Sequence, residues 1–232
     1  MPPRTNGLTA AAGALRYWER KQEITAHNLA NATTDGFKAE RAFAEVLGQA
    51  TPVARARTDM SGGTLRTTGN ALDVALEGDG FLVVATPQGE RFMRGGALRL
   101  DDARRLVDRE GHPVLGTHGE IVLPPGARVD LAADGTLGVD GRAVARLRLE
   151  RAGAPALERE GAGRFVPDAG RAPAAPGTVR VRQGALEESN VNPIGALVEM
   201  IVAQRAYASV QKAVTTMDAV RGTAVTELGR PV

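Results

Sequence analysis

The stretch that decides the fold is SNVNPIGALVEMIVAQRAYASVQKAVTTMDAVRGTAVTEL, which covers residues 189–228. Asn192 is suited to cap a helix, and Pro193 suits the first helical position, where no amide donor is needed. A helix over 193–228 would be about 50 Å long, against an average globular helix of about 11 residues. Along it, residues recur at alternating steps of three and four, the spacing of one helical seam. The seam consists of Met200, Ala203, Tyr207, Val210, Val214, Met217, Arg221, Ala224 and Leu228, and Arg221 is its one polar member.

A shorter helical stretch is predicted over residues 8–31. Its seam has the same step and contains Leu8, Ala11, Leu15, Trp18, Gln22, Thr25 and Leu29. Gln22 and Thr25 weaken this seam, because a helical core normally places leucine at such positions. We expect further copies of the chain to cover the apolar stripe of the C-terminal helix, since the predicted partner helix is too short to do so.

Between the two helices, short apolar alternations are separated by turn dipeptides that contain glycine. These dipeptides are Asp79-Gly80, Gln88-Gly89, Glu110-Gly111, His118-Gly119, Asp134-Gly135 and Asp140-Gly141. Many short strands with glycine at the turns are typical of an antiparallel β domain.

We therefore predict an α+β fold. Long N- and C-terminal helices would pack together in a coiled-coil-like, tube-forming arrangement, with a mostly antiparallel β domain inserted between them. The predicted parts are a helix with a polar loop or extension over 1–61, the β domain over 62–185, and the long C-terminal helix over 186–232, packing with the first helix.

Composition excludes several classes of function. The 232 residues include no cysteine, which excludes a disulfide scaffold, a thiol nucleophile and a thiolate metal site. Lys+Arg number 29 against 27 for Asp+Glu, so the net charge of +2 predicts neither nucleic-acid nor anionic-membrane binding. No apolar run approaches the roughly 20 residues of a membrane helix, so no membrane insertion is expected. Residues 1–7 lead into polar helical sequence, so no cleaved signal peptide is expected either.

No catalytic signature is present, and we expect neither an enzyme nor a cofactor or metal site. None of the three serines lies in a nucleophile elbow, and the glycines around Asp79 precede a predicted strand and not a helix. His112 and His118 lack metal-ligand spacing and are expected to be solvated turn residues. The adjacent carboxylates Glu187 and Glu188 are expected to be surface charge.

The segment Asn28-Leu29-Ala30-Asn31 ends the first helix with two amides three positions apart, followed by the polar loop 33–37. Two interpretations stay open. The segment is either a helix C-cap and loop, or a polar surface that docks against neighbouring copies.

Three motifs in order resemble the signatures of bacterial flagellar rod and hook proteins. The first is NLANATTDGFKA over 28–39; the second is TGNALDVALEGDGF over 68–81; the third is QGALEESNVNP over 183–193, followed by MIVAQRAY over 200–207. Together they span nearly the whole chain. The resemblance favours the proximal-rod type over the distal-rod type, because of residues 22–28. A hook-like axial protein is a further alternative.

The resemblance implies a structural subunit of the flagellar basal-body rod, with no reaction. It would assemble helically with itself and with other rod and hook axial proteins to form the drive shaft of the periplasm-spanning rod. The flagellar type III apparatus would export it without a cleaved signal. Phe43 and Leu47 fit a loose export-gate pattern, although a buried amphipathic turn is as good an interpretation.

The residues expected at the assembly interface belong to the two helices and to the loops at their ends. They are Leu15, Trp18, Asn28, Leu29, Asn31, Gly36, Phe37, Asn190, Asn192, Pro193, Leu197, Met200, Ile201, Gln204, Tyr207, Val210, Val214 and Met217. A β-rich peptidoglycan- or glycan-binding module is the alternative from another class. It is poorly supported, since sugar sites normally offer aromatic faces and only 3% of the residues are aromatic.

Overall fold

The computed structural model describes residues 7–45, 53–124, 128–153, 157–161 and 163–228. The chain forms two compact units. The helical unit comprises Met1–Ala30, Glu40–Arg57 and Asn192–Val232, and the β unit comprises Asn31–Ala39 and Thr58–Val191. The chain therefore passes from one unit to the other four times.

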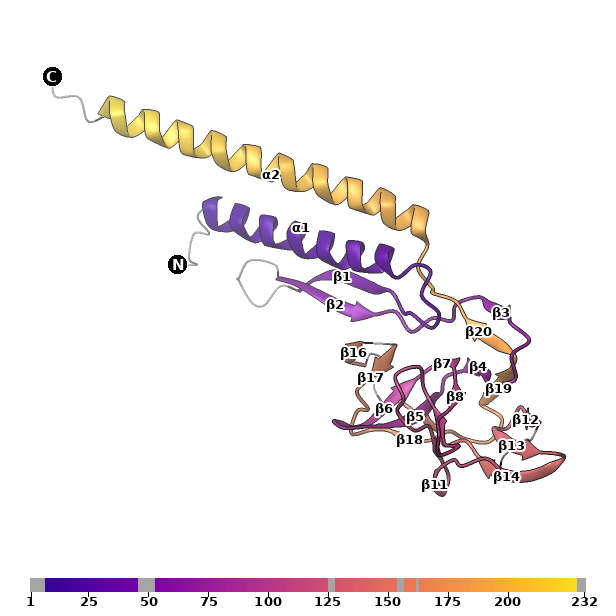
Figure 1. Cartoon of the computed structure of the whole chain (residues 1–232). Helices are drawn as coiled ribbons and strands as arrows, with labels where there is room; N and C mark the ends of the chain where they lie inside the picture. Colours follow the sequence, from indigo (N-terminus) through magenta and orange to yellow (C-terminus); the bar gives the residue numbers. More distant parts are fainter. Residues whose placement is uncertain (1–6, 46–52, 125–127, 154–156, 162, 229–232) are drawn as a thin grey trace. The chain divides into compact units, whose positions relative to one another are not determined.

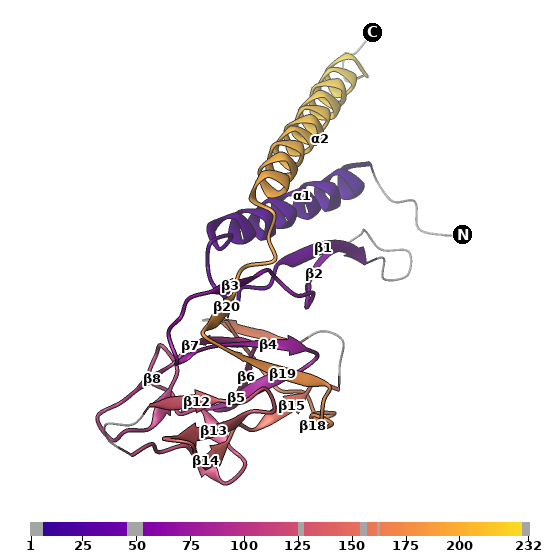
Figure 2. The ribbon, with the colours of Figure 1, turned by 90° about the vertical axis from the view of Figure 1, so that its right-hand side faces the viewer.

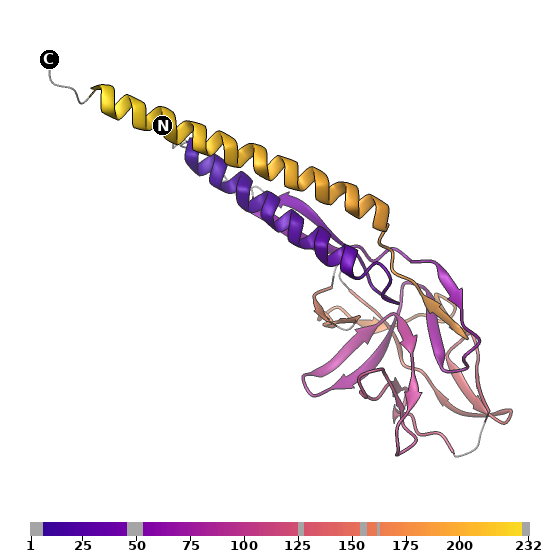
Figure 3. The ribbon, with the colours of Figure 1, turned by 45° about the horizontal axis from the view of Figure 1, so that its top comes forward.

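The helical unit contains helices α1 (Gly7–Ala30) and α2 (Pro193–Leu228) and the two-stranded sheet of β1 (Glu40–Glu45) and β2 (Val53–Thr58). α1 runs beside α2, and the C-terminal part of α2 extends beyond it (Figures 1 and 3). Asn192 caps α2, since its Oδ1 accepts a hydrogen bond from the amide of Gly195 at 3.0 Å. Neither helix combines the length and apolar character that a membrane-spanning helix requires.

The predicted α+β class, with terminal helices in long coiled-coil-like packing, is wrong. The described residues form two helices and twenty strands, so the chain is β-rich and built around a large antiparallel β domain. α1 and α2 contact each other but do not form a long coiled coil. α2 has 36 residues against 24 for α1, and α1 buries Gly13, Ile24 and Thr25 where a coiled coil would need a leucine repeat.

The β unit holds the remaining strands, which pair antiparallel. Its largest sheet has six strands in the order β16-β17-β6-β5-β15-β18. Two three-stranded sheets have the orders β19-β4-β7 and β12-β13-β14, and the strands of both are labelled in Figure 2. Three further pairs are β3-β20, β8-β9 and β10-β11. The strand bounds are β3 Leu65–Thr67, β4 Asp73–Gly78, β5 Phe81–Thr86, β6 Gly89–Met93, β7 Gly95–Ala97, β8 Arg99–Leu100, β9 Leu106–Val107, β10 Leu115–Gly116, β11 Gly119–Glu120, β12 Val129–Leu131, β13 Thr136–Val139, β14 Arg142–Arg146, β15 Leu149–Arg151, β16 Arg159–Gly161, β17 Arg164–Phe165, β18 Ala172–Pro173, β19 Val179–Gln183 and β20 Ala185–Glu187.

Strand β5 lies between the two apolar clusters of the β unit. Leu82 and Val84 belong to the larger cluster, and Phe81 and Val83 belong to the smaller one, which also contains Phe92. Successive side chains of a strand point to opposite faces of its sheet. Both faces of β5 are therefore covered, which explains why its first four residues are all apolar.

An ion-pair network joins strands β6, β15 and β18 at the surface of the β unit. Arg148 contacts both carboxylate oxygens of Glu90, at 2.8 and 3.1 Å, and Arg171 contacts Glu90 at 2.6 Å. Arg148 also donates to Glu150, at 2.6 Å. The hydrogen bond from Arg148 holds the pKa of Glu90 below its usual value, and the same contact raises the pKa of Arg148.

We expect this network to make the stability of the β unit depend on pH in the acid range. Because the folded pKa of Glu90 is lowered from 4.5, its contribution is complete at neutral pH and is lost as the pH falls through the folded pKa. Glu90→Gln should therefore lower the urea midpoint at pH 7, and the difference from the wild type should shrink on acidification. A difference that stays constant with pH would contradict this. Glu77→Gln, at the exposed pair with Arg182, is the control and should have little effect.

Candidate assembly surface

One side of α2 is apolar and exposed. Its first three turns carry large apolar residues at i, i+3, i+4, i+7 and i+8, a spacing that places them on one side of a helix. Their exposed fractions run from 44% at Ile201 to 76% at Ile194. These residues, hereafter the outer face, are Ile194, Leu197, Val198, Ile201 and Val202. An exposed apolar patch of this kind marks an interaction surface.

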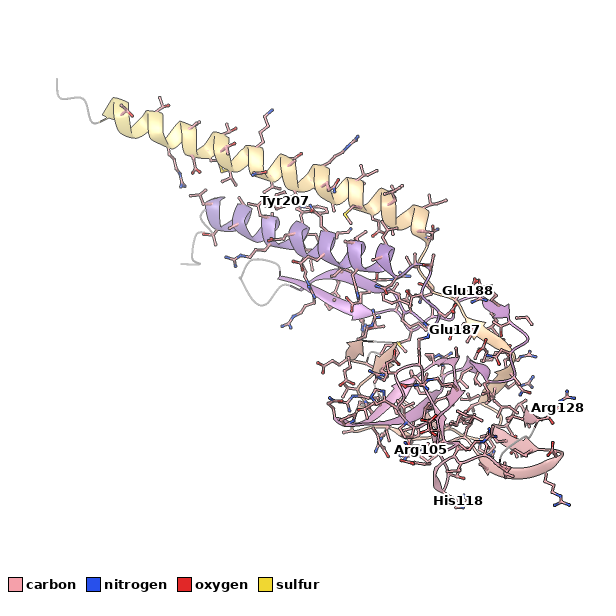
Figure 4. The ribbon with its side chains drawn as sticks, viewed as in Figure 1. Arg105, His118, Arg128, Glu187, Glu188 and Tyr207 are labelled. Carbon is pink, nitrogen blue, oxygen red and sulfur yellow. The ribbon has the colours of Figure 1, made fainter. Side chains whose placement is uncertain are left out.

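The opposite side of α2 is covered within the helical unit. Ala203 is completely buried, and Tyr207 lies on the side of α2 that faces α1 (Figure 4). Met200, Val210 and Val214 follow the same helical spacing and are half-buried. Four residues predicted for the interface thus lie on the side of α2 that packs within the helical unit. They are Met200, Tyr207, Val210 and Val214.

The other predicted interface residues of α2 and its cap are exposed, and two of them, Leu197 and Ile201, belong to the outer face. Asn192 and Pro193 are exposed at the first turn, where Asn192 serves as the cap. Gln204 is exposed, and Met217 is 42% exposed. Met217 therefore remains available for contacts outside the chain.

The predicted interface residues of α1 are half-buried. Leu15, Trp18 and Leu29 are all in this class. The Trp18 ring meets that of Tyr17 edge-on, with centroids 5.2 Å apart, and the ammonium of Lys21 lies 5.6 Å from the Trp18 ring centroid. Trp18 thus has partners within its own helix.

The amides at the end of α1 make local hydrogen bonds. Asn28 pairs with the backbone of Glu40, accepting from its amide at 2.9 Å and donating to its carbonyl at 2.7 Å. Asn31 Oδ1 accepts from the hydroxyl of Thr34 at 3.3 Å. These contacts correspond to the C-cap and loop interpretation of the segment. An additional docking role for it stays a prediction.

Three predicted interface residues are instead engaged inside the β unit. The amide of Gly36, which has φ 72°, donates to the carbonyl of Glu187 at 2.6 Å. Phe37 is 3% exposed. The amide of Asn190 donates to the carbonyl of Phe37 at 3.3 Å. Their role between copies of the chain therefore stays a prediction, while their role within the chain is defined by these contacts.

The export-gate pattern falls partly outside the described residues. Phe43 lies on β1 with 44% of its surface exposed, so the alternative of a buried turn does not describe its side chain. Leu47 lies outside the residues that the structure describes.

One carboxylate–imidazole cluster in the β unit has the spacing of a metal site. Ligand atoms of Asp108, Glu110 and His112 all lie within 4.8 Å of one another. Nη1 of Arg164, however, lies 3.1 Å from Asp108, 3.3 Å from Glu110 and 3.2 Å from the His112 ring. A guanidinium thus supplies the positive charge that a cation would supply. His112 is paired in this cluster, so the expectation of a solvated turn residue is wrong for it.

Three phenylalanines of the β unit are buried against one another. Phe81 stacks on Phe92 with ring centroids 4.9 Å apart, and Phe165 meets Phe81 edge-on at 6.1 Å. Their exposed fractions are 6%, 0% and 1% for Phe81, Phe92 and Phe165. None of the three offers a ring face to a sugar, which argues against the glycan-binding alternative.

Three family models match the chain in order. Residues 8–38 match the model described as "Flagella basal body rod protein". Residues 75–139 match "Flagellar hook protein FlgE/F/G D1 domain", and residues 182–227 match "Flagellar basal body rod FlgEFG protein C-terminal". The first and last matches cover most of the two helices, and the second covers much of the β unit.

Curated relatives match over nearly their full length. The flagellar basal-body rod protein FlgF of Escherichia coli (strain K12) is 36% identical, covering 92% of this chain and 94% of the relative. The chain belongs to the flagellar basal-body rod protein family. FlgF of Salmonella typhimurium is 33% identical over 94% of this chain and 96% of the relative. FlgG of Bacillus subtilis is 28% identical over 91% and 94%.

Membership of the rod family confirms the resemblance seen in the three sequence motifs. It places this rod protein in the flagellar basal body as a structural component, associated with other axial proteins of the flagellum. Both FlgF relatives are flagellar basal-body rod proteins.

Sequence reasoning missed part of the exposed surface of this rod protein. Ile194, Val198 and Val202 were not among the predicted interface residues, although they flank Leu197 and Ile201 on the outer face. Their signal is present in the sequence as a second apolar stripe on α2. A search for one 3-4 seam passes over it, because that seam lies on the opposite side of the helix.

Proposed function

We propose that the chain is a self-assembling subunit of the rod that joins copies of itself and other axial proteins into the drive shaft. The outer face of α2 is the observation that carries this proposal. Five large apolar side chains exposed on one side of a helix stabilise the chain only when another surface covers them.

The type of assembly follows from the position of that face. The side of α2 that carries Ala203 is already occupied within the chain. We infer that the outer face binds a different surface on its neighbour, because two outer faces bound to each other would form a closed pair and not a rod. Such heterologous contacts generate open helical assemblies when they do not close into a ring. A rod built from repeated contacts of this kind would have the helical symmetry that a drive shaft requires.

We further propose export by the flagellar type III apparatus without a cleaved signal, with Phe43 as part of the recognised segment. The exposed ring of Phe43 on a two-stranded sheet supports this proposal, because it is accessible to a partner. Assignment to the proximal rod stays a prediction from residues 22–28. The higher identities to the FlgF proteins than to FlgG of Bacillus subtilis support a place among FlgF-like subunits.

Deletion of the gene tests the proposed function directly. We expect loss of swimming and basal bodies that stop short of a complete rod in electron micrographs, with both defects restored by the wild-type gene on a plasmid. The stopping point would separate a proximal from a distal place in the rod. Intact flagella in the deletion strain would contradict the proposal, and retention of the purified chain on peptidoglycan would then favour the binding module.

A further inference from the structure

Residues 31–39 belong to the β unit, although they lie between α1 and β1 of the helical unit. This segment, hereafter the strap, ends in two large buried side chains. Phe37 is 3% exposed and Lys38 is 0% exposed. A lysine is almost never buried completely unless it is paired. The strap therefore has a specific docking site on the β unit.

The partner of Lys38 is Glu187. Glu187 is the last residue of β20 and is labelled in Figure 4. Nζ of Lys38 lies 2.6 Å from Oε1 of Glu187 and donates to the carbonyl of Ser61 at 2.6 Å. The same Oε1 accepts from the amide of Gly63 at 2.8 Å. Nε of Arg94 lies 3.6 Å from the other oxygen, Oε2. Glu187 was expected on the surface, and this is wrong, because its partner is 149 positions away in the sequence.

Asn190 completes the attachment of the strap. Its Oδ1 accepts a hydrogen bond from the backbone amide of Ala39 at 2.7 Å, and the backbone amide of Asn190 donates to the carbonyl of Phe37. Its Nδ2 donates to the carbonyls of Asp59 and Ser61, at 2.9 and 3.0 Å. The side chain of Asn190 thus connects three segments: the strap, residues 59–61, and the residues that follow β20.

Two further features support a tight fit between these segments. A Cβ on Gly63 would lie 2.0 Å from the carbonyl oxygen of Glu188, so only glycine allows the two backbones to approach so closely. The guanidinium of Arg159 lies 4.2 Å from the centroid of the Phe37 ring and donates to the carbonyl of Lys38 at 3.0 Å. The strap is therefore held by contacts to the Phe37 ring, to the Lys38 ammonium and to its own backbone.

The charges in this site depend on one another. Burial lowers the pKa of Lys38, while the hydrogen bond that Lys38 donates to Glu187 opposes that shift, and Arg94 and Asp59 act in opposite directions. Removing one partner of a buried ion pair leaves the other charge desolvated and uncompensated. The arrangement consequently favours two states only, with all the partners in place or with the strap released.

We propose that Lys38, Glu187 and Asn190 form a clasp that closes the strap onto the β unit and that opens as one local unit while the sheets stay folded. The clasp holds three segments, 36–39, 61–63 and 187–190. It cannot close before residue 190 is available, so the segment that follows α1 docks only in a chain whose β unit is complete. This inference does not depend on the proposed assembly or export.

Hydrogen exchange of the full chain, followed by mass spectrometry, tests the clasp. Lys38→Met removes the ammonium but keeps the length of the side chain. We expect amide exchange in all three segments to accelerate together, by on the order of 10²- to 10³-fold, the factor that corresponds to breaking a buried ion pair. The paired amides of β5 and β6 should keep their wild-type protection.

Two further variants keep the test decisive. Arg182→Met removes the exposed ion pair with Glu77 and should leave exchange in the three segments unchanged. Glu187→Gln keeps the hydrogen-bond acceptor but removes the charge, and it replaces Lys38→Met if that variant does not fold. Unchanged exchange would overturn the clasp, as would acceleration in one segment alone. Equal acceleration in β5 and β6 would show that the strap does not open separately.

Discussion

Replacement of Leu197 and Ile201 by aspartate together should abolish swimming and leave basal bodies without a complete rod. Full burial of a leucine or isoleucine contributes about 1.5–3 kcal/mol, and a neighbour can bury only the exposed half of Leu197 and Ile201, so the two changes remove about 1.5–3 kcal/mol of apolar burial from every contact that covers the outer face. Two carboxylates in that contact add a desolvation cost. Because a rod repeats its contacts, a loss at each one prevents assembly altogether. Swimming assays and electron micrographs of basal bodies in the complemented deletion strain measure the effect.

The double variant should still fold, since both residues are about half exposed in the isolated chain. Gln211→Asp is the matched control. It adds a carboxylate to an exposed polar position of the same helix that lies off the outer face, and it should swim normally. Val210→Asp lies on the side of α2 opposite to the outer face and is expected to abolish assembly by disturbing the packing between α1 and α2. Normal motility of the Leu197, Ile201 double variant would exclude the outer face as an assembly surface.

Local sequence signals located both helices. The spacing of apolar residues with Asn192 and Pro193 predicted a helix over 193–228, and α2 has these bounds. The stretch 8–31 corresponds closely to α1, Gly7–Ala30. Caps and helical periodicity depend on residues a few positions apart, which is why a sequence alone can define them.

The class of the fold and the site of Lys38 required knowledge of contacts that are distant in sequence. Periodicity indicated one seam on each helix, but it could not show that α1 would also bury Gly13 and Ile24 outside its seam and that the first turns of α2 would be exposed on the outer face. Likewise, no residue near Glu187 in the sequence indicates that Lys38, 149 positions earlier, pairs with its carboxylate. Two adjacent glutamates on a strand end are normally solvated, and tertiary pairing reversed that expectation for one of them.

The largest loss of stability from a single substitution in the β unit is expected for Phe92→Ala. Phe92 has no exposed surface, stacks on Phe81, and belongs to the smaller apolar cluster with Phe165 and Leu157. Truncation of a buried phenylalanine removes its transfer free energy and leaves a cavity, which together cost about 3–5 kcal/mol. A domain of ordinary stability, about 5–15 kcal/mol, would lose a large fraction of its free energy of unfolding. Urea titration of the full chain measures the change.

The choice of probe matters, because Trp18, Tyr17 and Tyr207 all lie in the helical unit, and the chain has no other tryptophan or tyrosine. Indole and phenol fluorescence therefore reports on the helical unit, and the two helices of that unit dominate far-ultraviolet circular dichroism, whereas amide exchange of β5 and β6 reports on the β unit. Phe43→Ala is the matched control, since it makes the same chemical change at a side chain that is 44% exposed, and it should cost less than about 1 kcal/mol. If Phe92→Ala were as mild as Phe43→Ala, the aromatic cluster would not hold the second face of β5. In that case the larger apolar cluster alone would have to account for the stability of the β unit.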